Sequence, residues 1–346
     1  MSVLQALREG IGLATRHWRA LLVVYLFNLL LAGAVALPVY LAIDAELAHT
    51  ESAGPMAEGF DWLWYQEFIS TRESGSDLSS TIAPWQQGLA PLLRNFEGYV
   101  RGSFRGNLPH GLMWLGVIYL LITTLLTGGI LGLFAEEDAR FTFRFFFDRA
   151  GRHFVILLGI LVVALLIYWL LWNTLGAAHR GLVAYARNDA TTEWTPVLVD
   201  WAGAIILMVL AFAVHMVMDY GRVASVAWGK LGLLPALLGA LGFSIRNVRK
   251  TLGLFYLTTL LAAVIALVYG LLIGLGGGAT TGQLIIMAVV QQAFILASIW
   301  IRMVYLGGQM SLYKSILNMP RWATPAGPPP EGEEDQVVVE ETTLPA

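Results

Sequence analysis

Long apolar segments separated by short polar ones fill most of this chain. A helix crosses the hydrocarbon layer of a membrane, roughly 30 Å thick, with about 20 apolar residues. The uncharged stretch between Lys250 and Arg302 is too long for one crossing, and a glycine-rich run at 274–282 divides it. The pattern therefore predicts six transmembrane helices, at about 20–43, 112–135, 154–178, 197–218, 252–274 and 283–305.

Composition favours a membrane protein over a large soluble domain. Hydrophobic residues make up 57% of the 346 residues and charged residues only 13%, against roughly 25% charged residues in soluble domains. We therefore expect an all-α, polytopic membrane protein whose basic, apolar N-terminus is retained as a helix rather than removed as a signal peptide. The sequence has no cysteine, which excludes disulfides and thiolate metal sites. No cofactor or metal is expected.

The distribution of basic residues predicts the orientation in the membrane. With both termini inside, 15 of the 21 Lys and Arg residues fall on the inner side of the predicted helices, as the positive-inside rule requires. We expect a multi-pass protein of a bacterial inner membrane, with both termini in the cytoplasm.

Polar and amphipathic regions complete the predicted domain organisation. Amphipathic segments are expected along the cytoplasmic interface at about 1–19 and 136–152. Within the connection 222–250, the uncharged residues 231–245 are too short to cross and are expected to form an interfacial or shallow re-entrant helix. Residues 44–111 are predicted to form an outer loop, either a lid on the bilayer or a surface that binds a partner or gates a substrate. Residues 1–315 would thus form one six-helix transmembrane domain, and the Pro-rich, acidic residues 316–346 a disordered cytoplasmic tail.

Two short motifs recur in the same order. An Arg-x-x-Arg pair precedes each outward helix, at Arg16/Arg19, Arg149/Arg152 and Arg246/Arg249. A Gly-x-x-x-small pair ends each returning helix, at Gly128/Gly132, Gly221/Ser225 and Gly307/Ser311. This order predicts an internal repeat of three helical hairpins. The arginines would anchor the hairpins to anionic lipid, by about 1 kcal/mol each, or form a collar that binds headgroups selectively. The glycine pairs are candidates for close helix packing.

Two groups of polar residues fall inside the predicted helices. His215, Asp219 and Arg222 are spaced by four and three residues, which places them on one helix face. Because a charge inside a membrane is costly and often functional, they are a candidate site for ion or proton handling; an anchoring ion pair is the alternative. Gln291 and Gln292 are the second candidate, either lining a pathway or packing against other helices.

Enzyme signatures are missing from the sequence. It has no His-Glu-x-x-His, no Gly-x-Ser-x-Gly and no phosphate-binding loop. We therefore expect a non-enzymatic membrane protein that acts in transport, lipid handling or membrane assembly, with anionic lipid headgroups as ligands at its inner face. The alternative is a scaffold subunit that docks a membrane-protein partner through 44–111 or the acidic tail. A hydrated cavity that reaches Gln291 or His215 would favour transport, and a solid bundle would favour a scaffold. Nucleic acid is not an expected partner.

Three local strings point to a family. LTGGIL at 126–131, FRFFF at 143–147 with Arg149, and DYGRV at 219–223 resemble a group of uncharacterised bacterial six-span proteins. That group is similar in layout to the membrane domain attached to some glycerophosphodiester phosphodiesterases. The resemblance covers about residues 1–315 and implies a six-span fold without catalytic residues. Because residues 1–346 contain no soluble phosphodiesterase domain, that activity is not expected.

Overall fold

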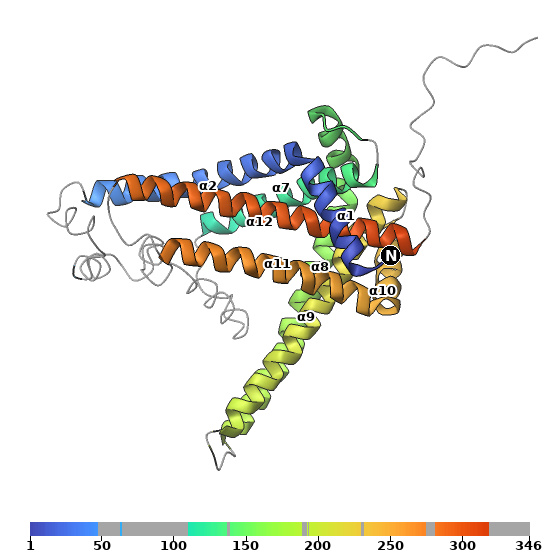
Figure 1. The fold of residues 1–346 in the computed structure, drawn as a ribbon. Helices are drawn as coiled ribbons and strands as arrows, with labels where there is room; N and C mark the ends of the chain where they lie inside the picture. Colours follow the sequence, from blue (N-terminus) through green and yellow to red (C-terminus); the bar gives the residue numbers. More distant parts are fainter. Residues whose placement is uncertain are drawn as a thin grey trace, which may run out of the picture.

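The computed structural model describes residues 1–47, 63, 110–136, 139–188, 192, 194–229, 232–274 and 281–317. The elements within these residues are the α-helices α1 Val3–Arg16, α2 Trp18–Leu47, α7 His110–Ala135, α8 Phe143–Asn188, α9 Trp194–Trp228, α10 Leu233–Arg246, α11 Val248–Gly274 and α12 Thr281–Ile316 (Figure 1). The all-α prediction is confirmed. Most of the predicted outer loop 44–111 and nearly all of the predicted tail 316–346 lie outside the described residues.

Helix length and composition identify a multi-pass membrane protein. Among the described residues, five helices are long and apolar enough to cross a membrane, and the bent pair α1 and α2 makes a sixth when it is counted as one span. Each of the six predicted segments lies inside one helix, in α2, α7, α8, α9, α11 and α12. Helix α10 has 14 residues, which is too short to cross.

Local sequence explains where the short interfacial helices begin and end. Helix α1 starts with a capping box, in which the Ser2 and Gln5 side chains each accept a hydrogen bond from the other residue's backbone nitrogen. Helix α10 carries Pro235 in its first turn, where a missing N–H costs no helical hydrogen bond. Each helix ends at a single non-helical residue, His17 for α1 and Asn247 for α10.

The three Arg pairs differ in their local structure. Helices α1 and α2 are bent by 73° about the break at His17, inside the first pair. Helices α10 and α11 break at Asn247, inside the third pair, where the asparagine side chain bonds the last turn of α10. The second pair, Arg149 and Arg152, lies within the unbroken helix α8. The amphipathic segment predicted at 136–152 is therefore mostly the beginning of a long membrane helix.

Helix α1 lies directly against the end of α12, although the two are far apart in sequence (Figure 1). Its buried face carries a small residue at every fourth position, Ala6, Gly10 and Ala14. A Cβ atom at Gly10 would lie 2.3 Å from the carbonyl oxygen of Val304 and 2.7 Å from the backbone nitrogen of Gly308. Only a hydrogen atom fits at this position, so the two backbones are in direct contact.

The beginning of α8 and the whole of α10 pack in a similar way on the ends of α7 and α9. A Cβ atom at Gly128 of α7 would lie 3.2 Å from the carbonyl oxygen of Ala150 in α8. One at Gly221 of α9 would lie 3.0 Å from the side chain of Leu237 in α10. The buried small residues of α10 stand at the same distances before their Arg pair as those of α1, at Ala236, Ala240 and Ser244. The internal repeat stays a prediction, but its three units make related contacts.

These contacts gather the inner ends of the helices around one hydrophobic core. Helices α7, α9 and α12 meet there with the start of α2, around fully buried residues such as Leu131, Tyr220 and Met303. Away from this end the helices diverge (Figure 1). Helices α8 and α9 stay paired, as do α11 and α12, whereas α2 and α7 make few contacts with each other. The first predicted hairpin is therefore open.

Replacing Gly10 with alanine should separate α1 from α12. The added methyl group would overlap backbone atoms that cannot move aside, and overpacking of this kind costs about 1–3 kcal/mol. Gly12 is the matched control, because a Cβ atom there would have nothing within 4 Å. Gly12→Ala should be neutral or more stable, by up to about 1 kcal/mol from helix propensity. Thermal unfolding of the two variants in detergent tests this contrast; equal stability would contradict the close contact.

His17 is buried at the bend between α1 and α2. Its side chain is 2% exposed, and its ring centroid lies 5.9 Å from that of Phe134 in α7. Burial, and to a smaller extent the charge of Arg16, lower the pKa of His17 below its ordinary value of 6.5. The fold therefore accommodates the neutral imidazole.

This burial predicts a loss of stability in acid. Below pH 6.5 the unfolded chain takes up a proton at His17 that the folded chain takes up only at lower pH, so the free energy of unfolding falls as the pH falls. His17→Gln cannot be charged and should lose less stability than the wild type between about pH 7.5 and about pH 5.5. The measurement is thermal unfolding across this range, and identical pH dependence in both proteins would exclude the effect.

Candidate functional site

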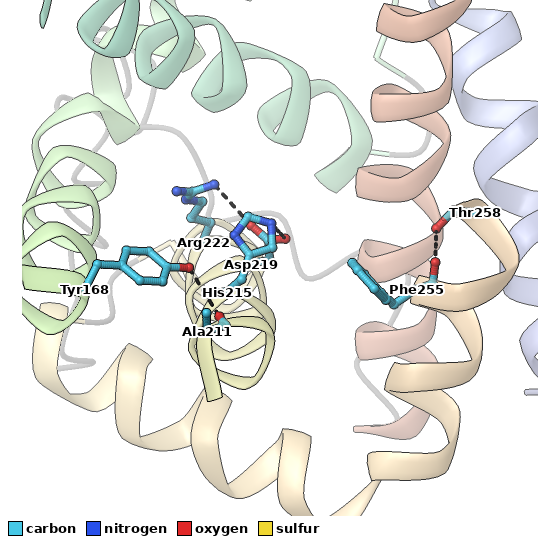
Figure 2. Close-up of polar contacts among 7 residues, drawn as sticks. All are labelled: Tyr168, Ala211, His215, Asp219, Arg222, Phe255 and Thr258. Carbon is cyan, nitrogen blue, oxygen red and sulfur yellow. Dashed lines mark hydrogen bonds and ion pairs between the residues drawn. The ribbon is translucent and has the colours of Figure 1, made fainter. Parts of the chain in front are cut away.

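His215, Asp219 and Arg222, here called the α9 group, come together on one face of α9 (Figure 2). The Asp219 carboxylate lies between two basic side chains: Nε2 of His215 is 3.3 Å from one oxygen, and Nη1 of Arg222 donates to the other at 3.1 Å. The Asp219 side chain is 5% exposed and that of His215 is 49% exposed. Asp219 is therefore a buried anion with both oxygens engaged.

Side chains from α8 and α12 approach the α9 group. The Tyr168 hydroxyl of α8 donates to the carbonyl of Ala211 at 3.4 Å, one turn before His215 (Figure 2). The hydroxyl of Tyr305 on α12 is buried near Asp219. The ion pair is thus part of the packing of α9 against its neighbours. His215 is the most exposed member of the group.

A second polar site lines a groove of about 760 Å³ between α2, α7 and α12, called here the α2–α7–α12 groove. Its apolar walls include Val24, Leu29, Ile295 and Ile299. The polar residues of the lining are Tyr25, Asn28, Tyr119, Gln291, Gln292, Ser298 and Arg302. The lining includes both predicted glutamines but no member of the α9 group. The candidates proposed from sequence are therefore two separate sites.

One hydrogen bond joins two walls of the groove. The Tyr25 hydroxyl of α2 donates to Oε1 of Gln292 on α12 at 2.7 Å. Asn28 lies about one turn later on α2. Its side-chain amide nitrogen donates a hydrogen bond to the backbone carbonyl of Val24 in the same helix, at 3.0 Å. The side chain of Gln291 has no hydrogen-bond partner among the described residues. The groove therefore offers an uncommitted amide within the membrane-spanning part of α12.

The Arg-x-x-Arg residues do not form one uniform collar. Arg149 is half buried, its guanidinium pairs with Glu136, and it lies 5.0 Å from the ring centroid of Phe145. Arg152 is exposed and pairs with Asp148 at 3.2 Å. The other four members are exposed beside helix breaks, at Arg16, Arg19, Arg246 and Arg249. Arg149 thus ties α8 to Glu136 after the end of α7, whereas Arg152 pairs within α8. The exposed first and third pairs are the better candidates for lipid headgroups.

The glycine pairs lie where the interfacial helices cross the returning helices. A Cβ atom at Gly132 would lie 2.6 Å from the Cβ of Arg149, and one at Gly307 would lie 3.1 Å from the Cα of Gly10. The other members are buried or half buried at the same helix ends, at Gly128, Gly221, Ser225 and Ser311. Their contacts are therefore made largely with the next interfacial helix rather than within one hairpin.

Sequence reasoning missed three features of these sites. Tyr25 and Arg302 were not assigned to a pathway, although both line the groove. A further pair joins the outer parts of α8 and α9, where Nε2 of His179 lies 3.1 Å from a carboxylate oxygen of Asp200 and His179 is 9% exposed. Spacing along one helix cannot reveal a pair between two helices. Arg302 does carry a signal, because it falls on the same helical face as Gln291.

Among the described residues, no cluster of three or more His, Asp or Glu side chains could hold a metal ion. Comparison with family models, with curated proteins and with solved structures gives no match. Function is therefore inferred from the geometry of the α9 group and of the α2–α7–α12 groove.

Asp219→Ala would leave Arg222 without its buried counter-ion and should lower the free energy of unfolding by about 3–5 kcal/mol. The matched control is Asp148→Ala, which breaks the exposed pair with Arg152 at nearly the same distance. It should cost less than about 1 kcal/mol, because water screens exposed pairs. Unfolding of both variants in mixed micelles measures the difference. Equal costs would show that the Asp219 pair does not stabilise the bundle.

Proposed function

We propose that this chain is a non-enzymatic protein of a bacterial inner membrane that handles a lipid or another amphiphile in the α2–α7–α12 groove. The groove itself supports this proposal most strongly. Binding pockets for small molecules commonly occupy about 300–1,000 Å³, and this one has about 760 Å³. It opens between helices that carry the predicted spans, so molecules dissolved in the bilayer can reach it from the side.

The chemistry of the lining favours an amphiphilic occupant. Its walls are largely aliphatic, yet Gln291, Gln292 and Arg302 also face the groove. Polar groups in hydrocarbon are costly unless they meet other polar groups or water. A purely apolar ligand would leave the charge of Arg302 without a partner, and a small polar solute would leave the aliphatic walls without a partner. A molecule with a polar head and apolar chains satisfies both.

The proposed orientation has both termini in the cytoplasm. The N-terminal helix α1 packs on the end of α12, so the two chain ends of the bundle lie on the same side (Figure 1). The Arg-x-x-Arg pairs belong to the helices of this packed end, which agrees with the positive-inside rule. The three-unit repeat and the resemblance to bacterial six-span proteins belong to this proposal as predictions from sequence.

A scaffold role is the second candidate, and one observation favours it. The paired helices α8 and α9 present large exposed apolar side chains along their diverging part, including Trp169 at 63%, Ile206 at 60% and Trp201 at 67% exposed. Such a face meets either lipid or a partner subunit. The amphiphile-handling role is preferred because a scaffold gives no reason for an uncommitted glutamine and an arginine beside a groove.

Filling the groove should prevent amphiphile binding. Ser298 lines the groove, and its hydroxyl donates a hydrogen bond to the backbone carbonyl of Phe294 in the same helix. Ser298→Trp should therefore occupy the space with little other change. We expect native mass spectrometry of the full chain, extracted in mild detergent, to show a bound lipid-like molecule on the wild type and its loss from the variant.

The matched control is Thr174→Trp on α8. Thr174 is also an exposed hydroxyl residue that bonds the carbonyl four residues earlier, but it lies outside the groove. This variant should keep the bound molecule. Equal retention by both variants would refute the groove as the binding site. Recovery of a stoichiometric partner protein in place of a lipid would favour the scaffold.

A further inference from the structure

Arg302 lies on one face of α12 with Gln291, Ile295 and Ser298, which together form a wall of the groove. Of the described residues that line the groove, Arg302 alone carries a charge, and no acidic side chain accompanies it. Its guanidinium has no ion-pair or hydrogen-bond partner in the described part of the chain. Because arginine stays charged in proteins, this position favours an anion.

The position of Arg302 along α12 sets its depth. Gly307, five residues later, contacts the interfacial helix α1, and five residues of α-helix rise by about 7.5 Å. Gln291 lies eleven residues in the other direction, which corresponds to about 16 Å. Half of the hydrocarbon layer measures about 15 Å. The groove therefore spans one leaflet, with the arginine near headgroup depth and the glutamine near the middle of the bilayer.

We propose that the groove holds one inner-leaflet phospholipid with an anionic headgroup, whose phosphate binds Arg302 and whose acyl chains run along the apolar walls toward Gln291. This assignment rests on the proposed function and names its ligand class. A guanidinium can bind phosphate through two parallel charge-assisted hydrogen bonds. The length of one leaflet between Arg302 and Gln291 matches the length of one lipid tail.

The same lining argues against other occupants. A free phosphate ion would use Arg302 but leave the aliphatic walls, such as Val24 and Ile299, without a partner. A zwitterionic headgroup would add a cation beside Arg302, and the described lining contains no carboxylate to receive it. Like charges at short range repel. An anionic phospholipid is the bilayer component that fits both the charge and the walls.

The test uses the full chain, delipidated in detergent and titrated with dioleoyl phosphatidylglycerol and dioleoyl phosphatidylcholine, with binding read by native mass spectrometry. We expect the wild type to prefer phosphatidylglycerol. Arg302→Gln should lower its affinity for that lipid about tenfold, as expected for loss of a charged hydrogen bond, with no change for phosphatidylcholine. Arg302→Lys should keep part of the preference, because it keeps the charge without the planar fork. Ser298→Trp should bind neither lipid.

The control is Arg144→Gln, which removes the same charge from an exposed site in α8 outside the groove and outside the Arg-x-x-Arg pairs. It should leave the preference unchanged; an equal loss in both variants would reduce the effect to general surface attraction and overturn the assignment. Equal binding of both lipids by the wild type overturns it too, while leaving the proposed function standing. Binding of neither lipid also overturns the assignment, and the proposed function falls with it when the extracted wild type carries no amphiphile either. If inorganic phosphate at an equal concentration displaces phosphatidylglycerol, Arg302 binds a free anion, and the phospholipid assignment is wrong. If Arg302→Gln does not fold, the lipid preference of the wild type and of Arg302→Lys tests the assignment instead.

Discussion

Backbone contact between small residues at the inner helix ends is the constraint on which this fold depends. Lipid tails are as apolar as leucine, so no hydrophobic effect draws membrane helices together, and close packing must hold them. Glycine permits the closest approach, and at Gly10 the backbone of α12 leaves no room for a methyl group. Because these contacts lie at one end of the bundle, the other end is free to diverge. The α2–α7–α12 groove follows from that asymmetry.

The positions of the helices could be predicted because bilayer thickness fixes their length. The Arg pairs alone could not predict where a helix ends, since other residues and their contacts determine whether the helix breaks inside a pair. Asn247 competes for backbone hydrogen bonds and ends α10 with its own side chain. Inside the second pair Gly151 weakens the helix, but Ala150 is fully buried against Gly128 of α7 and Arg149 is tied to Glu136, so packing holds the helix together. Helix α8 therefore continues where α1 and α10 stop.

The two candidate sites were not equally visible in the sequence. His215, Asp219 and Arg222 share one helix, so their spacing alone brings them together. The groove draws on three helices whose relative placement depends on distant packing, and its cross-wall bond joins Tyr25 to Gln292. Periodicity could have linked Arg302 to Gln291 on α12, but it could not have supplied the facing wall.

The asymmetry of packing also separates the roles of the two sites. Asp219 lies within two residues of the Gly221 contact, at the packed inner end of the bundle. A buried carboxylate is tolerated there because His215 and Arg222 hold both of its oxygens. A site committed in this way has little capacity left for a ligand. Gln291 lies instead where helices have separated, with its amide uncommitted. The polar residues best suited to binding are therefore those in the loosely packed region, and the most conspicuous charged group in the sequence is better suited to holding the bundle together.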